Sequence, residues 1–429
     1  MNLTPIKALC FFAIVMINFL ANAQEALQIV DSKTINHDIC IYKPNPFANP
    51  SYVPVPKVIR DKIDSQDRSS ACSTINVTYT GFTTEAQTAF QYAVDIWASL
   101  IDTSVPIEIN ATFGPLGPGV IGSAGAFTYL GLTGGSLPEV TFHPIALANS
   151  LLGSDQRIND PDINATFSNT FNFYFGTDGA TPSGQIDFVT VVLHEIGHGL
   201  GIAGFGREVL DINDNPTGEG AIRYSGFAGI WDHHIENSTP TSIISTSNYP
   251  DPSVALYGQL TSDDLFSNGA QATVLNGNVK PKIYAPNTWN SGSSYSHWDE
   301  NYYPSGNPQA LMTPQVGYGE ANHNPGTVTL AFMEDMGWSL CGSPLSTESF
   351  EDFAQVSLYP NPVKDLLTIK SNEVIKLVCI YNTLGQEIFK IEPNKLETSI
   401  NFEQLKNGVY YTNVTIGKNT KNYKIVKTQ

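Results

Sequence analysis

The chain has 429 residues and a formal net charge of −18, from 22 Lys and Arg against 40 Asp and Glu. This acidic balance argues against a nucleic-acid partner, because binding to phosphates needs a cluster of basic side chains. It suits a folded, secreted protein, and a chain of this length is expected to contain more than one domain.

Residues 1–23 have the pattern of a signal peptide. Lys7 precedes an apolar stretch that ends at a small-residue cleavage site, Ala21-Asn22-Ala23. The stretch is too short to cross a membrane well and no other segment is longer, so no transmembrane span is expected in the mature chain. Cys10 lies inside the apolar stretch rather than just after the cleavage site, which argues against a lipoprotein.

Residues 24–72 are rich in Pro and Asn and are expected to be irregular, as a short pro-segment or an extended arm. Cys40 lies next to a histidine-containing string, but no surrounding motif supports a thiol that blocks a metal site. In an oxidising compartment we expect one disulfide among Cys40, Cys72 and Cys341. Cys379 lies in an apolar run and is expected to be a buried free thiol.

The globular part is expected over 73–342, and it begins with the alternating string INVTYTGF, which predicts a strand. Thr84 and Gln87 have the spacing of a capping box, which predicts the start of a helix. Apolar residues at three- and four-residue steps extend this helix to about Leu100. The string VPIEINATF then alternates with period two, as a second strand does.

The most specific motif is the string His-Glu-Ile-Gly-His-Gly-Leu-Gly, from His194 to Gly201. On a helix, His194 and His198 project from the same face. Two imidazoles at this spacing can hold one Zn²⁺ ion, and Glu195 then faces the reacting water as a general base. The surrounding residues are apolar at helical steps, as expected of a buried active-site helix.

A catalytic zinc site needs a third protein ligand. In the short motif HExxHxxGxxH the third histidine would stand at Gly204, which cannot bind a metal. One candidate is His297, in the string SYSHWDENYY. One alternative is a histidine of the adjacent pair His233 and His234, whose two side chains point apart. The other is a carboxylate ligand, Glu208. His143 and His323 are interpreted as ordinary surface or loop histidines.

These strings resemble the leishmanolysin branch of the metzincin zinc peptidases. In that branch a long insertion separates the motif glycine from the third histidine, which stands in a Ser-His-Trp-Asp/Glu string ahead of a Leu-Met turn. The resemblance covers about 186–204 and 284–338 and departs from the pattern in its long insertion and in the extra residues YYPSGNPQ. The residues that match the family pattern are His194, Glu195, His198, Gly201, His297 and Met312.

The resemblance implies an α+β, metzincin-like catalytic domain with a twisted sheet, an active-site helix, a Met-turn and a C-terminal helix. It implies Zn²⁺ held by His194, His198 and His297, with Glu195 as the base for peptide-bond hydrolysis and Met312 in the turn. The string TVTLAFMEDMGWSL is the expected last helix, closed by a glycine. Tyr318 is a weak candidate for stabilising an oxyanion.

The insertion over about 205–296 is too long for a simple loop. It is expected to form its own small lobe and one wall of a substrate cleft. Its acidic string DINDNPTGEG resembles a calcium loop only loosely, because Pro216 stands where the turn needs glycine and Ile222 where the last ligand belongs. Calcium is therefore allowed by the composition but not indicated.

A polar linker is expected over 343–355, followed by a small all-β sandwich over 356–429, because short alternating strands are separated by turn signals. The strings YPNPVKD, YNTLGQEI, LKNGVYY and KNYKIVK are similar to the C-terminal sorting domain of the type IX secretion system of Bacteroidetes. This resemblance implies export through the periplasm to the medium or the cell surface, with the secretion machinery as partner. The alternative is a carbohydrate-binding or adhesion module that uses Tyr410 or Tyr411.

The sequence therefore predicts a secreted zinc endopeptidase that acts, as a monomer, on protein or peptide substrates. The competing hypothesis is a secreted adhesion or binding protein that keeps the fold without turnover. Glu195 favours the enzyme, because a binding protein that merely retains the metal has no need of a base.

Overall fold

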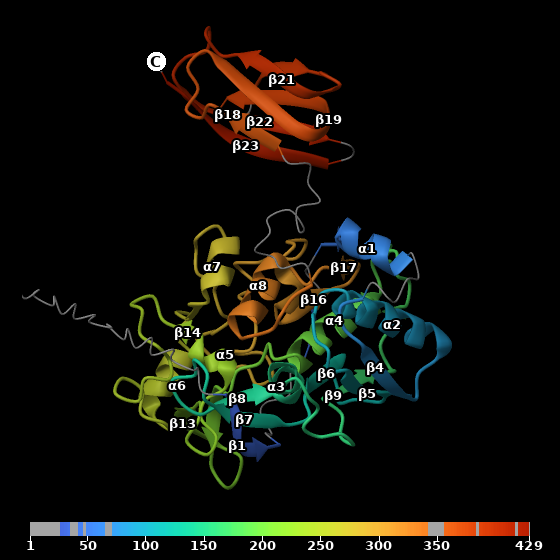
Figure 1. The fold of residues 1–429 in the computed structure, drawn as a ribbon, viewed down its shortest axis with the longest axis vertical. Helices are drawn as coiled ribbons and strands as arrows, with labels where there is room; N and C mark the ends of the chain where they lie inside the picture. The colour runs from blue at the N-terminus through green and yellow to red at the C-terminus, as the bar shows by residue number, and fades with distance from the viewer. Residues whose placement is uncertain are drawn as a thin grey trace, which may run out of the picture.

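The computed structural model describes residues 26–34, 42–45, 49–64, 71–341, 356–382, 386–416 and 419–428. These residues form a large body and, in orange and red in Figure 1, a separate C-terminal sheet with its own hydrophobic core. The predicted signal peptide, Cys40 and the predicted linker lie outside the described residues. Within the described part, no helix has both the length and the apolar character needed to cross a membrane.

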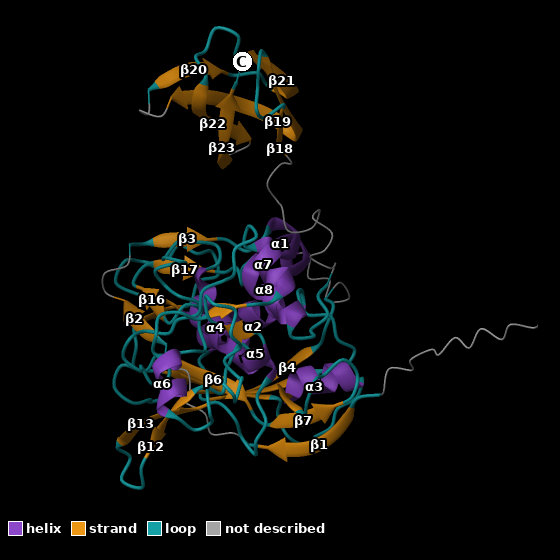
Figure 2. Cartoon of the chain, turned by 90° about the vertical axis from the view of Figure 1, so that its left-hand side faces the viewer, coloured by secondary structure: helices purple, strands orange, loops and turns teal. Residues whose placement is uncertain are grey.

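The large body contains a four-stranded sheet of order β4-β5-β9-β6. Three strands are parallel, and β6 pairs antiparallel to β9 at one edge. The strands are β4 (Ile75–Thr80), β5 (Ile107–Gly114), β6 (Gly122–Ala126) and β9 (Ile163–Ser168). Alternate residues of β5 are buried, as its period-two pattern predicts. Figure 2 shows helices α2 (Thr84–Ala98) and α4 (Phe188–Gly199) on one side of this sheet.

Helix α2 begins one residue earlier than the capping-box spacing predicts. Thr83 is the N-cap: its backbone is extended, and its Oγ1 accepts a hydrogen bond of 3.2 Å from the amide of Ala86. The predicted pairing of Thr84 with Gln87 is therefore wrong, because Thr84 already has helical geometry. At the other end of α2, the Trp97 indole donates to the carbonyl of Leu193, 3.1 Å away, and ties α2 to α4.

Helix α4 carries the HExxH motif and is buried along its whole length. Asp187 caps it, accepting from the amide of Thr190 at 2.8 Å. Gly201 follows the helix with φ of 118°, a conformation that side chains other than glycine rarely adopt. A Cβ there would also lie 2.9 Å from Pro144, so this motif position requires glycine on two counts.

Where the structure describes it, the N-terminal segment forms short strands and one helix, whereas irregular chain was expected there. Its strands pair with strands distant in the sequence: β1 antiparallel with β7, β2 parallel with β16, and β3 parallel with β17. A Pro-rich segment can pair in this way at a sheet edge. The bounds are β1 (Gln28–Lys33), β2 (Lys43–Asn45), β3 (Ser51–Val53), α1 (Lys57–Asp64), β7 (Tyr129–Thr133), β16 (Gln315–Gly317) and β17 (Glu320–Asn322).

The insertion after α4 shares the hydrophobic core of the large body. Its buried side chains, such as Trp231 and Leu256, belong to the same cluster as those of α2 and α4. Its elements are β12 (Arg207–Leu210), β13 (Pro216–Ala221), α5 (Ile230–His233), β14 (Ile235–Glu236), α6 (Val254–Leu260), β15 (Phe266–Ser267) and α7 (Ala270–Leu275). The insertion is thus a continuous part of the large body.

The remaining elements of the large body are short. They are β8 (Thr141–Pro144), α3 (Ile145–Leu152), β10 (Phe173–Tyr174), β11 (Ile186–Asp187), η2 (Ala310–Met312) and α8 (Thr327–Asp335). Helix α8 matches the predicted last helix, and Gly337, with φ of 111°, lies just beyond its C-cap. Glycine at this point is the usual way for a helix to end.

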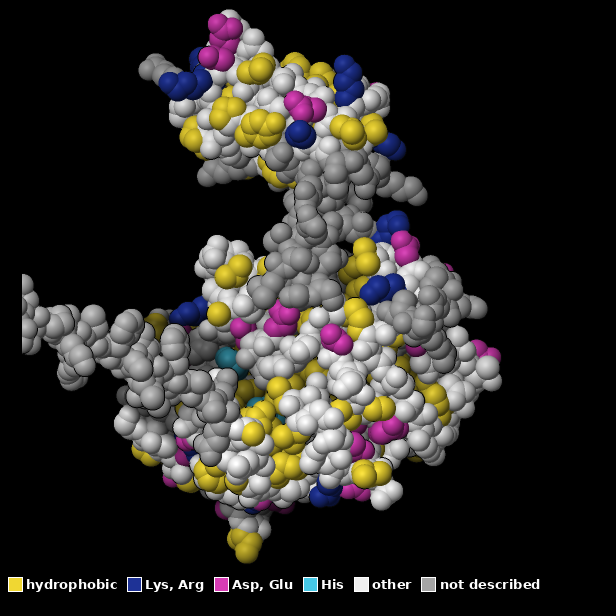
Figure 3. Space-filling model, in the orientation of Figure 1, with side chains coloured by type: hydrophobic (Ala, Val, Ile, Leu, Met, Phe, Trp, Pro, Cys, Tyr) yellow, Lys and Arg dark blue, Asp and Glu magenta, His cyan; other side chains and the backbone are white. Residues whose placement is uncertain are grey.

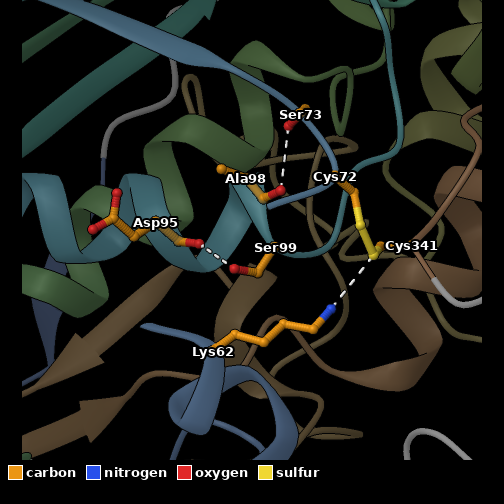
Figure 4. The surroundings of a disulfide bond; sticks show 7 residues. All are labelled: Lys62, Cys72, Ser73, Asp95, Ala98, Ser99 and Cys341. Carbon is orange, nitrogen blue, oxygen red and sulfur yellow. Dashed lines mark hydrogen bonds between the residues drawn. A yellow bond between two sulfur atoms is a disulfide. The ribbon is translucent and has the colours of Figure 1, made fainter. Parts of the chain in front are cut away.

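A disulfide joins Cys72, just before β4, to Cys341, just after α8 (Figure 4). This confirms the expectation of one bridge and identifies its two members. Lys62 of α1 lies beside it, with Nζ 3.5 Å from the Cys341 sulfur. The disulfide thus links the segment before β4 to the segment after α8, near the two ends of the large body's sequence.

The C-terminal region is a six-stranded, sandwich-like β structure, in agreement with the sequence prediction. Strand β19 is a single long strand that pairs with β18, β20, β21 and β22, and β22 pairs with β23. The bounds are β18 (Val356–Tyr359), β19 (Leu366–Asn382), β20 (Glu387–Ile391), β21 (Lys395–Asn401), β22 (Gly408–Ile416) and β23 (Asn419–Lys427). Cys379 is a buried free thiol, as predicted. Exposed apolar side chains, among them Leu366 and Leu396, lie on this region, whose surface is partly yellow in Figure 3.

Candidate metal centre

Three buried histidines from two distant parts of the chain converge on one point. His194 and His198 lie one turn apart on α4, and His297 approaches from the loop before η2. The Nε2 atom of His198 lies 3.0 Å from that of His194 and 3.2 Å from that of His297, and the third distance is 3.3 Å. Among the described residues, this is the group whose ligand atoms lie close enough together to hold a metal ion.

The second nitrogen of each ring fixes which nitrogen faces the centre. The Nδ1 atoms of His194, His198 and His297 lie 2.7, 2.5 and 2.7 Å from the carbonyl oxygens of Leu311, Ile202 and Ser293. A carbonyl only accepts, so each Nδ1 carries the proton and each Nε2 presents a lone pair. Three lone pairs facing one another at these distances repel unless a cation lies between them.

The arrangement fits zinc. With Zn–N bonds of about 2.0–2.1 Å, a tetrahedral site places its nitrogen ligands roughly 3.3 Å apart, close to the three observed distances. Burial, with the neighbouring histidines, lowers the pKa of His194 and of His297 well below the usual value for imidazole. The rings are therefore neutral, which is the form that binds metal.

Glu195 lies on the same helix turn and is fully buried. Among the described residues, neither of its carboxylate oxygens has a close hydrogen-bond partner. Burial raises the pKa of Glu195 well above its usual value, and the backbone of Ala124 offsets this only in part. The Glu195 side chain packs against the edge strand β6. A Cβ added to Gly122 of this strand would lie 3.3 Å from the Glu195 Cγ. A carboxyl that is buried with so little hydrogen bonding is costly, and such groups cluster at functional sites.

Met312, at the end of η2, packs against helix α4. A Cβ on Gly197 would lie 2.7 Å from the Met312 sulfur, so the helix and the turn are in close contact there. The preceding carbonyl, that of Leu311, is the acceptor for His194. Gly204 has no room for a ligand, because a Cβ would lie 2.2 Å from the ring of Tyr295.

The alternative third ligands lie elsewhere. His233 is 3.1 Å from the Thr141 hydroxyl, and the ring of His234 packs edge-on against Phe332. Glu208 lies on β12, outside the group of three histidines. Among these candidates, only His297 is brought to the pair on α4.

Two histidines expected on the surface or in loops are buried. His143 lies on β8, which is buried along its whole length, and His323, in the loop after β17, binds the helix cap Asp187 at 2.8 Å. Tyr318 is half-buried against the main core, and within the described residues no hydrogen bond joins it to the histidines or to Glu195. Its suggested role in stabilising an oxyanion stays untested.

Tyr42 of the N-terminal arm contacts the site, and sequence reasoning missed it. Its ring stacks on that of His194, with centroids 3.8 Å apart and planes 5° from parallel. No motif surrounds Tyr42, so only the long-range strand pairing of the arm brings it here.

Asp232 holds the loop that carries His297, and it too was missed. Its carboxylate accepts hydrogen bonds from the amides of Phe205 and Gly229 and from the hydroxyl of Tyr295, at 2.8–3.0 Å. Burial raises its pKa to about 7, although these bonds act in the opposite direction. Asp232 thereby joins the segment after α4 to a residue two positions before His297.

Asp232→Ala is expected to lower the free energy of unfolding by roughly 3 kcal/mol or more, because three buried donors lose their acceptor. Zinc affinity is expected to fall as the His297 loop loosens. Denaturant unfolding and zinc titration measure the two effects. Unchanged stability together with unchanged zinc affinity would rule out this positioning role.

Comparisons with known proteins bear mainly on the C-terminal region. The family model described as a secretion system C-terminal sorting domain matches residues 357–428. A second model, described as SPBPB7E8-like, matches residues 143–211, which contain the HExxH segment. No curated protein matches the chain significantly.

Among solved structures, one similar chain is PorZ, described as an essential bacterial surface component of the type IX secretion system of Porphyromonas gingivalis. The identity is 22%, the TM-score is 0.18, and the match covers 22% of this chain and 14% of that one. This chain thus spans only a small part of PorZ, and the match does not establish a common fold. The sorting-domain match, in contrast, shows that the protein is exported to the cell surface or the medium.

Proposed function

We propose that the protein is a secreted zinc endopeptidase of metzincin type. The observation that carries the proposal is the meeting of three lone-pair-bearing Nε2 atoms beside a buried carboxyl group without a close partner. A merely structural zinc site is usually closed by four protein ligands. Here the described residues supply three, with a candidate general base next to them.

Each residue has a distinct role in the proposed reaction. His194, His198 and His297 would hold the ion, and the carbonyls that accept from their Nδ1 atoms keep the rings in the metal-binding tautomer. When bound, zinc lowers the pKa of water and polarises a carbonyl oxygen. Glu195 accepts the proton of the attacking water and returns it to the leaving amine.

The raised pKa of Glu195 is consistent with this role. A dication beside the carboxyl stabilises its ionised form and so lowers the pKa from the value that burial alone would give. A base whose pKa lies above that of an ordinary carboxylate also receives the proton more readily. The adhesion hypothesis, in contrast, gives no role to a buried carboxyl at this position.

The test is hydrolysis of unfolded casein by the purified exported protein, before and after removal of metal with 1,10-phenanthroline. We expect cleavage at internal peptide bonds, loss of activity after chelation and recovery with about one equivalent of Zn²⁺ per chain. Size-exclusion chromatography would test the accompanying proposal of a monomer. Chelation that leaves hydrolysis unchanged would refute the zinc mechanism.

Removal of residues 345–429 is expected to stop export and leave the catalytic activity intact. The C-terminal region has its own core, and the large body is closed by its disulfide at Cys341. The deletion is made in a bacterium with a type IX secretion system, and activity is assayed in medium and periplasm. Active enzyme retained in the periplasm supports the sorting role. Normal export would contradict it, and normal export with loss of surface or polysaccharide binding would favour the adhesion module.

A further inference from the structure

A buried pair of side chains ties the start of α4 to the segment that follows Met312. The Oδ1 atom of Asp187 lies 2.8 Å from the Nε2 atom of His323, and both side chains are fully buried. A carboxylate only accepts hydrogen bonds, so the imidazole donates this one. Within the part of the chain that the structure describes, the Nδ1 atom of His323 has no hydrogen-bond partner, so the ring is held through Nε2.

Asp187 does not need His323 to cap the helix. Its Oδ1 also accepts from the amide and the hydroxyl of Thr190, at 2.8 and 2.7 Å, and its Oδ2 accepts from the hydroxyl of Thr181 at 2.9 Å. These donors satisfy the buried carboxylate and the first turn of α4. The bond from His323 therefore adds a link between the helix and another part of the chain.

The same two parts of the chain meet again at the metal centre. Next to the pair, the amide of Asn322 donates to the hydroxyl of Thr190 at 2.8 Å. At the other end of the segment, the carbonyl of Leu311 accepts from the Nδ1 atom of His194 at 2.7 Å. The segment 311–323 is thus bonded to α4 at both of its ends.

This segment also holds the third histidine. The amide of Trp298, the residue after His297, donates to the carbonyl of Met312 at 3.0 Å. The segment is therefore bonded both to α4 and to the loop of His297, the two sources of the proposed metal ligands. Because the distances from a metal ion to its ligands must hold to within about 0.2 Å, the placement of α4 against this segment affects how all three rings meet one ion.

We propose that Asp187 and His323 are positioning residues, which set α4 against the segment 311–323 and keep the three histidines at the distances that zinc needs. The inference rests on the proposed function and adds two residues that support its metal centre from a distance. The competing view is that the pair only stabilises the fold. The two views differ in whether the metal centre of a folded variant changes.

The test compares three variants of the full chain. His323→Leu removes the donor, while Asp187 keeps the donors from Thr190 and Thr181. We expect its zinc affinity to fall about tenfold, the lower end of the loss seen when groups that orient metal ligands are removed. Zinc affinity is measured by competition with a chelator, and the visible absorption bands of the Co²⁺-loaded chain, which report ligand geometry, are expected to shift.

Two further variants serve as controls. His323→Gln, whose amide can still donate to Asp187, is expected to keep zinc affinity and the cobalt spectrum close to those of the unchanged chain. His143→Leu makes the same substitution at another buried imidazole, which bonds the carbonyl of Thr141 on its own strand. This variant is expected to leave both measurements unchanged, even where it lowers stability.

Unchanged zinc affinity and an unchanged cobalt spectrum in folded His323→Leu would overturn the inference, whatever stability is lost. If this variant does not fold, Asp187→Ser replaces it, because serine caps a helix about as well as aspartate but is too short to reach His323. The same losses are then expected, and unfolding of both variants would overturn the inference. Losses of affinity with no casein hydrolysis in any chain, the unchanged one included, would support the positioning role while refuting the peptidase.

Discussion

His297→Ala is expected to lose bound zinc and peptide hydrolysis together. Two imidazoles on α4 remain, but a catalytic zinc site needs three protein ligands. The Nε2 atoms of these two rings, those of His194 and His198, lie 3.0 Å apart. At micromolar protein, we expect the zinc content to fall from about one per chain to near zero, measured by elemental analysis after dialysis.

The chain supplies matched controls for this variant. His233→Ala and His234→Ala remove a partly buried imidazole of the same type, and both residues were alternatives for the third ligand. Both controls are expected to keep zinc and activity, since their side chains contact Thr141 and Phe332 rather than the metal site. Full zinc content in the His297 variant would move the third ligand elsewhere.

Glu195→Gln is expected to abolish hydrolysis while zinc stays at about one per chain. The amide keeps the size of the side chain but cannot accept a proton, and the loss of a general base lowers rates by about a hundredfold to ten-thousandfold. The three ligands are untouched, because Glu195 accepts none of their hydrogen bonds. Rates are measured at matched zinc content.

The same variant tests whether Glu195 acts as a general base or as a metal ligand. Zinc loss equal to that of the His297 variant would show that Glu195 is a ligand. Hydrolysis that survives the substitution would remove it from the mechanism.

Local patterns predicted the elements whose signals lie within one stretch of sequence. The active-site helix, the strand β5 and the final helix follow from periodicity and from a glycine terminator. The C-terminal strands follow from alternation between turn signals, although β19, from Leu366 to Asn382, is longer than the short strands expected. The choice of His297 as third ligand needed the family resemblance, because spacing left His233, His234 and Glu208 open.

The rest depends on contacts between residues distant in the sequence. The N-terminal segment forms strands because β7, β16 and β17 supply partners. Its own Pro-rich sequence contains no local signal for these strands and therefore predicted irregular structure. Likewise, Asp232 and His323 are buried by the assembled body, each with partners far along the chain. Composition cannot distinguish such buried polar residues from surface ones, because the difference lies in the partners that satisfy them.

Anomalous diffraction at the zinc absorption edge, from crystals of the purified exported protein, tests the zinc centre most directly. We predict one strong peak, within about 2.0–2.1 Å of the Nε2 atoms of His194, His198 and His297. A peak at His233 or Glu208 instead, or full zinc content with no peak at the three histidines, would contradict the account.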